Sequence, residues 1–117
     1  MSEKLKIHIQ DCNSKPEVKI VNIEGTLDML APPVLEKTIP PLIEQGYNIV
    51  FDCRNLEYVN SRGLVAFLEY SAKLKGKGKS FKVCNINKSV YETMDISGAL
   101  KLLDIYDSLK DAIESIK

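Results

Sequence analysis

The chain has 117 residues, of which 44% are apolar, and its 16 basic residues balance 16 acidic ones to a net charge of zero at pH 7. This length suits one domain with one core, and the apolar share is enough for a packed globule rather than a disordered chain. A balanced charge gives no electrostatic reason to expect a nucleic-acid-binding protein. We therefore predict a single domain over residues 1–117 with no nucleic-acid partner.

The amino-terminal sequence MSEKLKIHIQD lacks the continuous apolar stretch of a secretion signal. No run of the chain approaches the roughly 20 apolar residues that a membrane-spanning helix needs. The three cysteines include no C-x-x-C pair, and this odd number is typical neither of a disulfide framework nor of a zinc site. These features predict a soluble, intracellular protein without a membrane partner, a metal or a cofactor.

Strands are predicted in the first half of the chain where polarity alternates. Residues 5–10 alternate as an edge strand does. Residues 17–24 alternate more regularly and carry apolar residues on both faces, and the run ends at Gly25-Thr26-Leu27-Asp28, where the glycine suits a bulge or a turn. Residues 47–53 contain consecutive apolar residues, and such a run predicts burial on both faces of a sheet.

A helix is predicted between these strands, over residues 32–45, because apolar residues recur there at helical spacing after a proline pair that suits a first turn. A second pair, Pro40 and Pro41, interrupts this pattern. Each proline would remove a hydrogen bond and crowd a carbonyl, at a cost of about 3 kcal/mol in a helix interior. We predict a kinked helix or two short pieces, closed by Gly46.

Residues 64–74 place apolar side chains on one helical stripe, which predicts a second helix. A basic run with two glycines then breaks the pattern, and we interpret it as a solvated loop after a helix. The alternative is contact with an anion or an acidic partner, although Gly76-Lys77-Gly78 lacks the spacing of a phosphate loop. The basic residues of the run are Lys73, Lys75, Lys77, Lys79 and Lys82.

The last third of the chain continues the alternation of strands and helices. Residues 81–86 predict a strand, and Asn87 can cap a helix that stops near Gly98. Residues 100–106 hold a last short strand or turn, and Ser108 can cap a terminal helix. Strands followed by helices predict an α/β fold in which helices pack on a sheet of mostly parallel strands.

Few residues suggest catalysis or metal binding. The single histidine, His8, is interpreted as a surface or edge residue. Cys53 and Cys84 lie in apolar strand runs and are interpreted as buried small hydrophobes, whereas Cys12 is expected to be exposed. Ser61 lacks G-x-S-x-G flanks and a histidine near it in sequence, so we expect no enzyme, with a serine hydrolase as the minor alternative.

A polar Asn-Ser-Arg-Gly, residues 60–63, separates a strand-like run that reaches Val59 from the apolar run that follows. In the simplest interpretation, Asn60 or Ser61 is a helix N-cap, whose loss would cost about 1 kcal/mol. In the functional interpretation, a phosphate on Ser61 would be tolerated, because a helix start carries about half a positive charge and free amide donors. The phosphate would add about −1.5 to −2 charges to a balanced surface and so would change what that surface binds.

Three stretches also carry a resemblance to a known family. They are GTLD at 25–28, NIVFDC…LEYVNSRGLVAF…FKVCNI at 48–86, and MDISGALKLL at 94–103. They resemble the STAS domain, the anti-sigma factor antagonist family, over nearly the whole chain and in the family's order. The resemblance implies a STAS-like α/β fold, with a mixed four- to five-stranded sheet and about four helices.

The resemblance also implies a function. Members of this family are small cytoplasmic switch proteins that bind an anti-sigma factor, often a serine kinase as well, and so release a sigma factor. The kinase phosphorylates a serine or threonine in the turn, which ends the binding, and a phosphatase restores it. The implied partners of this chain are therefore an anti-sigma factor serine kinase and a serine phosphatase. The alternative is a STAS scaffold or ligand-binding module that is never phosphorylated and acts in a larger assembly.

Four residues match the family's motifs by position. Ser61 matches the phosphoacceptor, Gly63 the glycine that closes the turn, and Leu64 the apolar residue that starts the helix. Asp28 matches the acid of the GELD-like loop, which lies near the phosphorylation site and contributes to the partner surface.

Other residues depart from the family's pattern. Asn60 keeps the capping ability but lacks the negative charge that the family usually has before the serine. Arg62 replaces a small residue with a large cation, which can either pair with a phosphate or hinder a kinase. The Pro40–Pro41 pair is a further departure, on the first helix. The implied phosphorylation site is Ser61, and the implied partner-binding residues are Asp28, Asn60, Ser61, Arg62, Gly63 and Leu64.

Overall fold

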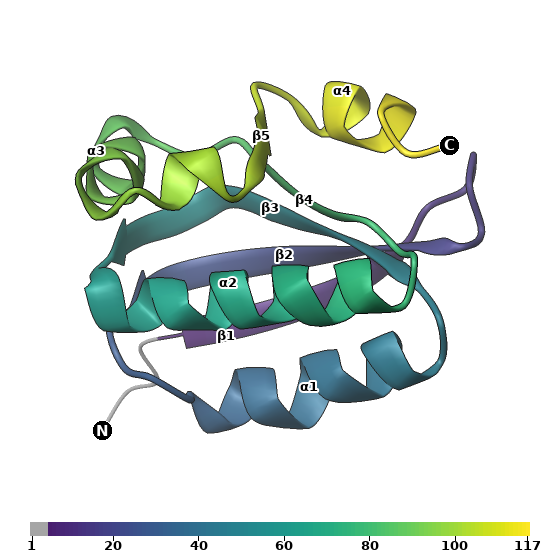
Figure 1. The fold of residues 1–117 in the computed structure, drawn as a ribbon, viewed down its shortest axis with the longest axis horizontal. Coiled ribbons are helices and arrows are strands. Elements are labelled where there is room, and N and C mark those ends of the chain that lie inside the picture. Colours follow the sequence, from purple (N-terminus) through teal and green to yellow (C-terminus); the bar gives the residue numbers. More distant parts are fainter. Residues whose placement is uncertain (1–4) are drawn as a thin grey trace.

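The computed structural model describes residues 5–117, which form one sheet with helices on both faces (Figure 1). The described residues contain five strands and four α-helices, which confirms the predicted α/β class with a mixed sheet. The strands are β1 (Leu5–Asp11), β2 (Val18–Leu27), β3 (Asn48–Val59), β4 (Phe81–Cys84) and β5 (Asp104–Tyr106). The helices are α1 (Pro33–Glu44), α2 (Ser61–Gly76), α3 (Lys88–Ser97) and α4 (Leu109–Glu114), with a short 3-10 helix, η1 (Ala99–Lys101), before β5.

The strands lie in the sheet in the order of the chain, β1-β2-β3-β4-β5. The edge strand β1 runs antiparallel to β2, as a hairpin allows, and the other neighbours are parallel and are joined through helices. Leu27 pairs with Val59, so β2 and β3 end side by side. The loop that follows β2 and the helix that follows β3 therefore start at the same end of the sheet.

Helices α1, α2 and α3 cover one face of the sheet, and α4 covers part of the other (Figure 1). The larger cluster of buried residues lies under the three helices. It includes Phe51, whose ring meets those of Phe67 in α2 and Phe81 in β4 at centroid distances of 5.1 and 4.8 Å. The smaller cluster lies under α4 and includes Val50 and Ala112. Because Val50 and Phe51 are adjacent but lie in different clusters, the predicted burial of β3 on both faces is confirmed.

Two strands extend further than the sequence pattern predicted. The second strand was predicted over residues 17–24, and β2 continues beyond them to Leu27, within the stretch of residues 25–28 where the run was predicted to end. The predicted bulge is confirmed, since the pairing with β3 shifts next to Gly25 and this glycine has a φ of 105°. The run predicted over 47–53 and the strand-like run that reaches Val59 form one strand, β3, which pairs with the extended β2 through its polar middle.

Helix α1 is one uninterrupted element, so of the two predicted alternatives, a kinked helix or two short pieces, the second was wrong. Pro40 and Pro41 lie inside it and lack the amide hydrogens that two helical bonds require. The helix buries Leu35, Ile39 and Ile43 against the larger cluster. Each such side chain stabilises the fold by about 1.5–3 kcal/mol, which is enough to offset the prolines. The apolar stripe, rather than backbone preference, therefore keeps this segment helical.

The turn between β1 and β2 holds α4 in place. The Lys15 ammonium donates hydrogen bonds to the backbone oxygen of Ile113, at 2.9 Å, and to that of Ile116. These oxygens lie at the carboxyl end of the helix, where a positive charge is favourable. At the other end, the predicted cap is confirmed, because the Ser108 hydroxyl oxygen accepts from the backbone nitrogen of Asp111 at 3.1 Å.

The predicted limits of α3 are also confirmed. The side-chain oxygen of Asn87 accepts from the backbone nitrogen of Val90 at 2.8 Å, and Gly98 ends the helix in the left-handed region with a φ of 84°.

The cysteines lie inside the molecule. Cys53 and Cys84 are buried, as predicted, and His8 is exposed on the edge strand, as predicted. The expected exposure of Cys12 was wrong, because this residue is 4% exposed and belongs to the smaller cluster. Cys12 is buried by contact with α4, which lies about 100 residues later in the chain, and a local sequence pattern cannot predict such a contact.

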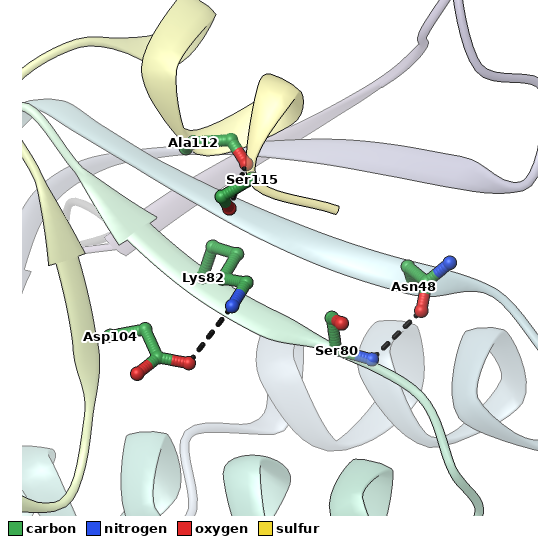
Figure 2. A network of polar contacts seen from close by, with 6 residues as sticks. All are labelled: Asn48, Ser80, Lys82, Asp104, Ala112 and Ser115. Carbon is green, nitrogen blue, oxygen red and sulfur yellow. Dashed lines mark hydrogen bonds and ion pairs between the residues drawn. The ribbon is translucent and has the colours of Figure 1, made fainter. Parts of the chain in front are cut away.

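The basic run is a loop only in part. Lys73 and Lys75 are exposed in the last turn of α2, and Lys77 is exposed directly after it. Positive charges there favour the carboxyl end of the helix. The loop interpretation was wrong for Lys82, which lies in β4 and pairs with Asp104 of β5 at 3.0 Å (Figure 2).

None of the described helices is both long enough and apolar enough to cross a membrane.

Candidate functional site at the start of helix α2

Asn60 is the cap of α2. It has an extended backbone, with φ −106° and ψ −178°, and its side-chain oxygen accepts from the backbone nitrogen of Gly63 at 2.9 Å. Its backbone oxygen accepts from the nitrogen of Leu64 at 3.1 Å. Of the two candidates for the cap, Asn60 therefore fills the role and leaves the Ser61 side chain without a capping task.

Ser61 is the first residue of α2, and both Ser61 and Arg62 are exposed. The helix has no acidic residue in its first turn. A first-turn position is surrounded by backbone N–H groups that have no acceptor within the helix, so a negative group is favoured there. A group attached to the Ser61 hydroxyl would point into solvent from a favourable electrostatic position.

Asp28 lies beside this turn, as the motif comparison predicted. The backbone nitrogen of Asn60 donates to the Leu27 oxygen at 3.2 Å, and the side-chain nitrogen of Asn60 donates to the Asp28 backbone oxygen at 3.3 Å. Both bonds join the residue before α2 to the chain that leaves β2. The start of α2 and the loop after β2 therefore form one continuous surface.

Gly63 and Leu64 lie beneath this surface. A Cβ atom on Gly63 would stand 2.3 Å from the Leu27 carbonyl oxygen, a distance at which backbone would have to move. Leu64 is 1% exposed and packs in the larger cluster. In this structure both residues position the turn, whereas Asn60, Ser61 and Arg62 reach its surface.

A further part of the surface escaped the sequence analysis. Met29 and Leu30 are 48% and 56% exposed, which is high for large apolar side chains. Met29 lines a cavity of about 240 Å³. The signal was the run Met-Leu-Ala-Pro-Pro after Asp28, which puts apolar residues where a connecting loop is usually polar. The cavity is lined by Leu5, Thr26, Leu27, Asp28, Met29, Pro32, Pro33 and Val34.

The clearest pKa shifts lie away from this turn. Burial raises the pKa of the Cys53 and Cys84 thiols and of the Tyr70 hydroxyl, and all three groups lie in or against the core. The described residues contain no group of three or more His, Cys, Asp or Glu side chains that could hold a metal ion. What the surface offers is an exposed hydroxyl at a helix start beside an exposed apolar loop, which suits a surface for another protein.

The chain belongs to the STAS domain family, whose model matches residues 10–112. Its relatives include an anti-sigma-B factor antagonist of Bacillus subtilis (strain 168), 33% identical over 85 residues that cover 73% of this chain and 78% of the relative. An anti-sigma F factor antagonist of Paenibacillus polymyxa is 29% identical over 102 residues, which cover 86% of this chain and 87% of the relative.

Solved structures agree with this assignment. An anti-sigma factor antagonist from Mycobacterium paratuberculosis superposes with a TM-score of 0.84 at 25% identity, over 96% of this chain and 93% of that one. The unphosphorylated anti-sigma factor antagonist SpoIIAA has a TM-score of 0.76 at 19% identity, over 94% of this chain and 95% of its own, and this likeness supports the fold alone. The predicted STAS-like fold is confirmed.

Proposed function

We propose that this chain is a cytoplasmic anti-sigma factor antagonist. It binds an anti-sigma factor that is also a serine kinase, and the sigma factor is thereby released. The kinase phosphorylates Ser61, which ends the binding, and a serine phosphatase restores it. The chain acts through binding and has no catalytic activity of its own. The single observation that carries the proposal is the exposed Ser61 at the start of α2, joined through Asn60 to the loop after β2.

The partner surface consists of the exposed part of the turn, Asn60–Arg62, and the loop of residues 28–30. The apolar side chains of Met29 and Leu30 supply area that a partner can bury, and the cavity that Met29 lines can receive an apolar side chain. The turn supplies polar contacts at the rim of that area. Gly63 and Leu64 contribute by holding the turn in place.

A phosphate on Ser61 would switch this surface without unfolding the domain. Ser61 does not cap the helix, and its hydroxyl accepts no backbone N–H in the described hydrogen bonds, so its modification removes no bond that the serine side chain itself makes. The phosphate would place about −1.5 to −2 charges on the turn that the partner contacts, and binding would have to desolvate them. The affinity therefore falls while the free protein stays folded.

The direct test is to incubate the purified chain with ATP and the anti-sigma factor kinase of the same organism. Intact mass should rise by one phosphate, and fragment masses should place it on Ser61. Ser61→Ala should take no phosphate and keep the partner, and Ser61→Asp should bind more weakly. Ser89→Ala is the matched control, since Ser89 is an exposed serine in the first turn of α3. A phosphate that persists in Ser61→Ala would refute the proposal.

The second candidate is an unphosphorylated STAS scaffold or ligand-binding module in a larger assembly. Arg62 favours it, because this exposed cation stands directly after the acceptor, where members of the family usually have a small residue. Under this alternative, the kinase leaves the mass of the chain unchanged, and affinity capture returns a multi-subunit assembly without a kinase.

A further inference from the structure

The Asn60 side chain uses both ends of its amide. Its oxygen accepts from the Gly63 nitrogen at 2.9 Å, inside the first turn of α2. Its nitrogen donates to the Asp28 backbone oxygen at 3.3 Å, in the loop after β2. One side chain therefore connects the turn that carries Ser61 with the loop that carries Met29 and Leu30.

This connection needs an amide. A carboxylate caps a helix as well as an amide does, but it has only acceptors and cannot donate to a carbonyl oxygen. An aspartate at position 60 would keep the bond from Gly63 and would face the Asp28 oxygen with a negative charge. The cap and the connection to the loop can thus be separated by one substitution.

A phosphate on Ser61 would act on the same amide. Ser61 directly follows Asn60, so the phosphate oxygens would lie near the Asn60 side-chain oxygen. Both groups would compete to accept hydrogen bonds from the N–H groups of the first turn, including that of Gly63. Repulsion and competition both displace the Asn60 oxygen. When the amide turns away from Gly63, its nitrogen leaves the Asp28 oxygen as well.

We infer that Asn60 is a positioning residue that transmits the state of Ser61 to the loop of residues 28–30. The inference rests on the proposed phosphorylation of Ser61 and adds a route by which it acts. The phosphate then does more than repel a partner, because it also releases the apolar loop that the partner would bury.

The chain supplies a matched control in Asn87. This residue caps α3 in the same way, with its oxygen accepting from the Val90 nitrogen at 2.8 Å. Its amide nitrogen donates to the backbone oxygens of Leu56 and Glu57, each at 3.2 Å. Asn87→Asp removes the same donor from the same kind of position without touching the loop after β2.

The experiment follows the methyl signal of Met29 by NMR, with the buried Met94 methyl as a reference for an intact core. Ser61→Asp is introduced into the natural chain, into Asn60→Asp and into Asn87→Asp. In the natural and Asn87→Asp backgrounds, it should move both the Gly63 amide signal and the Met29 methyl signal. In the Asn60→Asp background the Gly63 signal should still move, but the Met29 signal should move less than half as far. Asn60→Ser, a shorter cap, should behave like Asn60→Asp.

Equal displacement of the Met29 signal in all three backgrounds would overturn the inference, as would no displacement in any of them. The outcome separates from that of the proposed function, because the NMR series uses no kinase. If the kinase phosphorylates Ser61 but Asn60→Asp does not change how far the Met29 signal moves, the proposed function stands and the inference fails. If the coupling appears but no kinase modifies Ser61, the proposed function fails.

Discussion

The carbonyl oxygen of Leu27 occupies the space that any side chain on Gly63 would need, 2.3 Å from the position of its Cβ atom. The last residue of β2 and the first turn of α2 are therefore in backbone contact. This contact fixes the distance between the Ser61 turn and the loop after β2, and the absence of a side chain at position 63 is what permits it.

Gly63→Ala should lower the free energy of unfolding by about 3 kcal/mol, because the atom opposite the new methyl group is backbone and cannot rotate away. Urea unfolding at neutral pH measures the loss. Gly76→Ala is the control, since Gly76 also lies in α2 but has nothing within 4 Å of its added Cβ. That variant should change stability by no more than about 1 kcal/mol. Equal losses in the two variants would contradict the close contact.

The two polar residues at the turn should differ in their effect on stability. Asn60→Ala removes the cap of α2 and should cost about 1 kcal/mol. Ser61→Ala removes an exposed hydroxyl and should stay within about 0.5 kcal/mol. Thermal or urea unfolding of both variants checks the difference. A larger loss in Ser61→Ala would mean that the serine, and not Asn60, caps the helix.

Stability should fall as the pH rises through about 9. Burial, reinforced by Asp52 and opposed by Arg54, raises the pKa of Cys84 from 9.0 to about 12. The unfolded chain loses this proton as the pH passes about 9, whereas the native chain keeps it until about 12, so the unfolded state is favoured across this window. Below that window, the thiol is protonated in both states and its contribution is constant.

Urea unfolding between pH 7 and pH 10.5 should show this decline, and Cys84→Ala should make it shallower. The slope should not vanish, because burial also raises the pKa of Cys53 and of Tyr70. A Cys84→Ala profile parallel to that of the natural chain would show that this thiol is not the source.

Lys15 should contribute to the attachment of α4. Lys15→Met removes a charged donor from the carbonyl oxygens at the end of this helix and should cost about 1–2 kcal/mol. Backbone hydrogen exchange in α4 should accelerate more than exchange in α2. Lys110→Met is the control, since Lys110 is exposed on α4 and its loss should stay within about 0.5 kcal/mol. An unchanged rate of hydrogen exchange in α4 would show that Lys15 does not hold this helix in place.

Local patterns predicted much of the fold. The caps at Asn87 and Ser108 and the burial of β3 on both faces follow from neighbours a few residues apart, and the structure confirms them. The prediction failed where contacts between residues far apart in the chain determine the structure. Helix α1 stays continuous through Pro40 because the sheet buries its apolar stripe. Cys12 is buried because α4 returns to cover it.

The candidate site shows the same division. Position in the chain was enough to place Ser61 at a helix start, and the family motif was enough to bring Asp28 near it. The sequence could not decide between Asn60 and Ser61 as the cap, since both side chains can fill that role. The exposed Met29 and Leu30 were missed, although apolar residues in a loop that is usually polar were a visible signal of them.

The carboxyl terminus follows α4. It lies toward the opposite end of the molecule's longest axis from the beginning of α2 (Figure 1), and the molecule extends over 34 Å along this axis. A biotin, a fluorophore or a sensor surface linked behind Lys117 would accordingly leave the Ser61 turn facing outward. Immobilisation through that end gives a practical geometry for measuring how fast a partner arrives and departs.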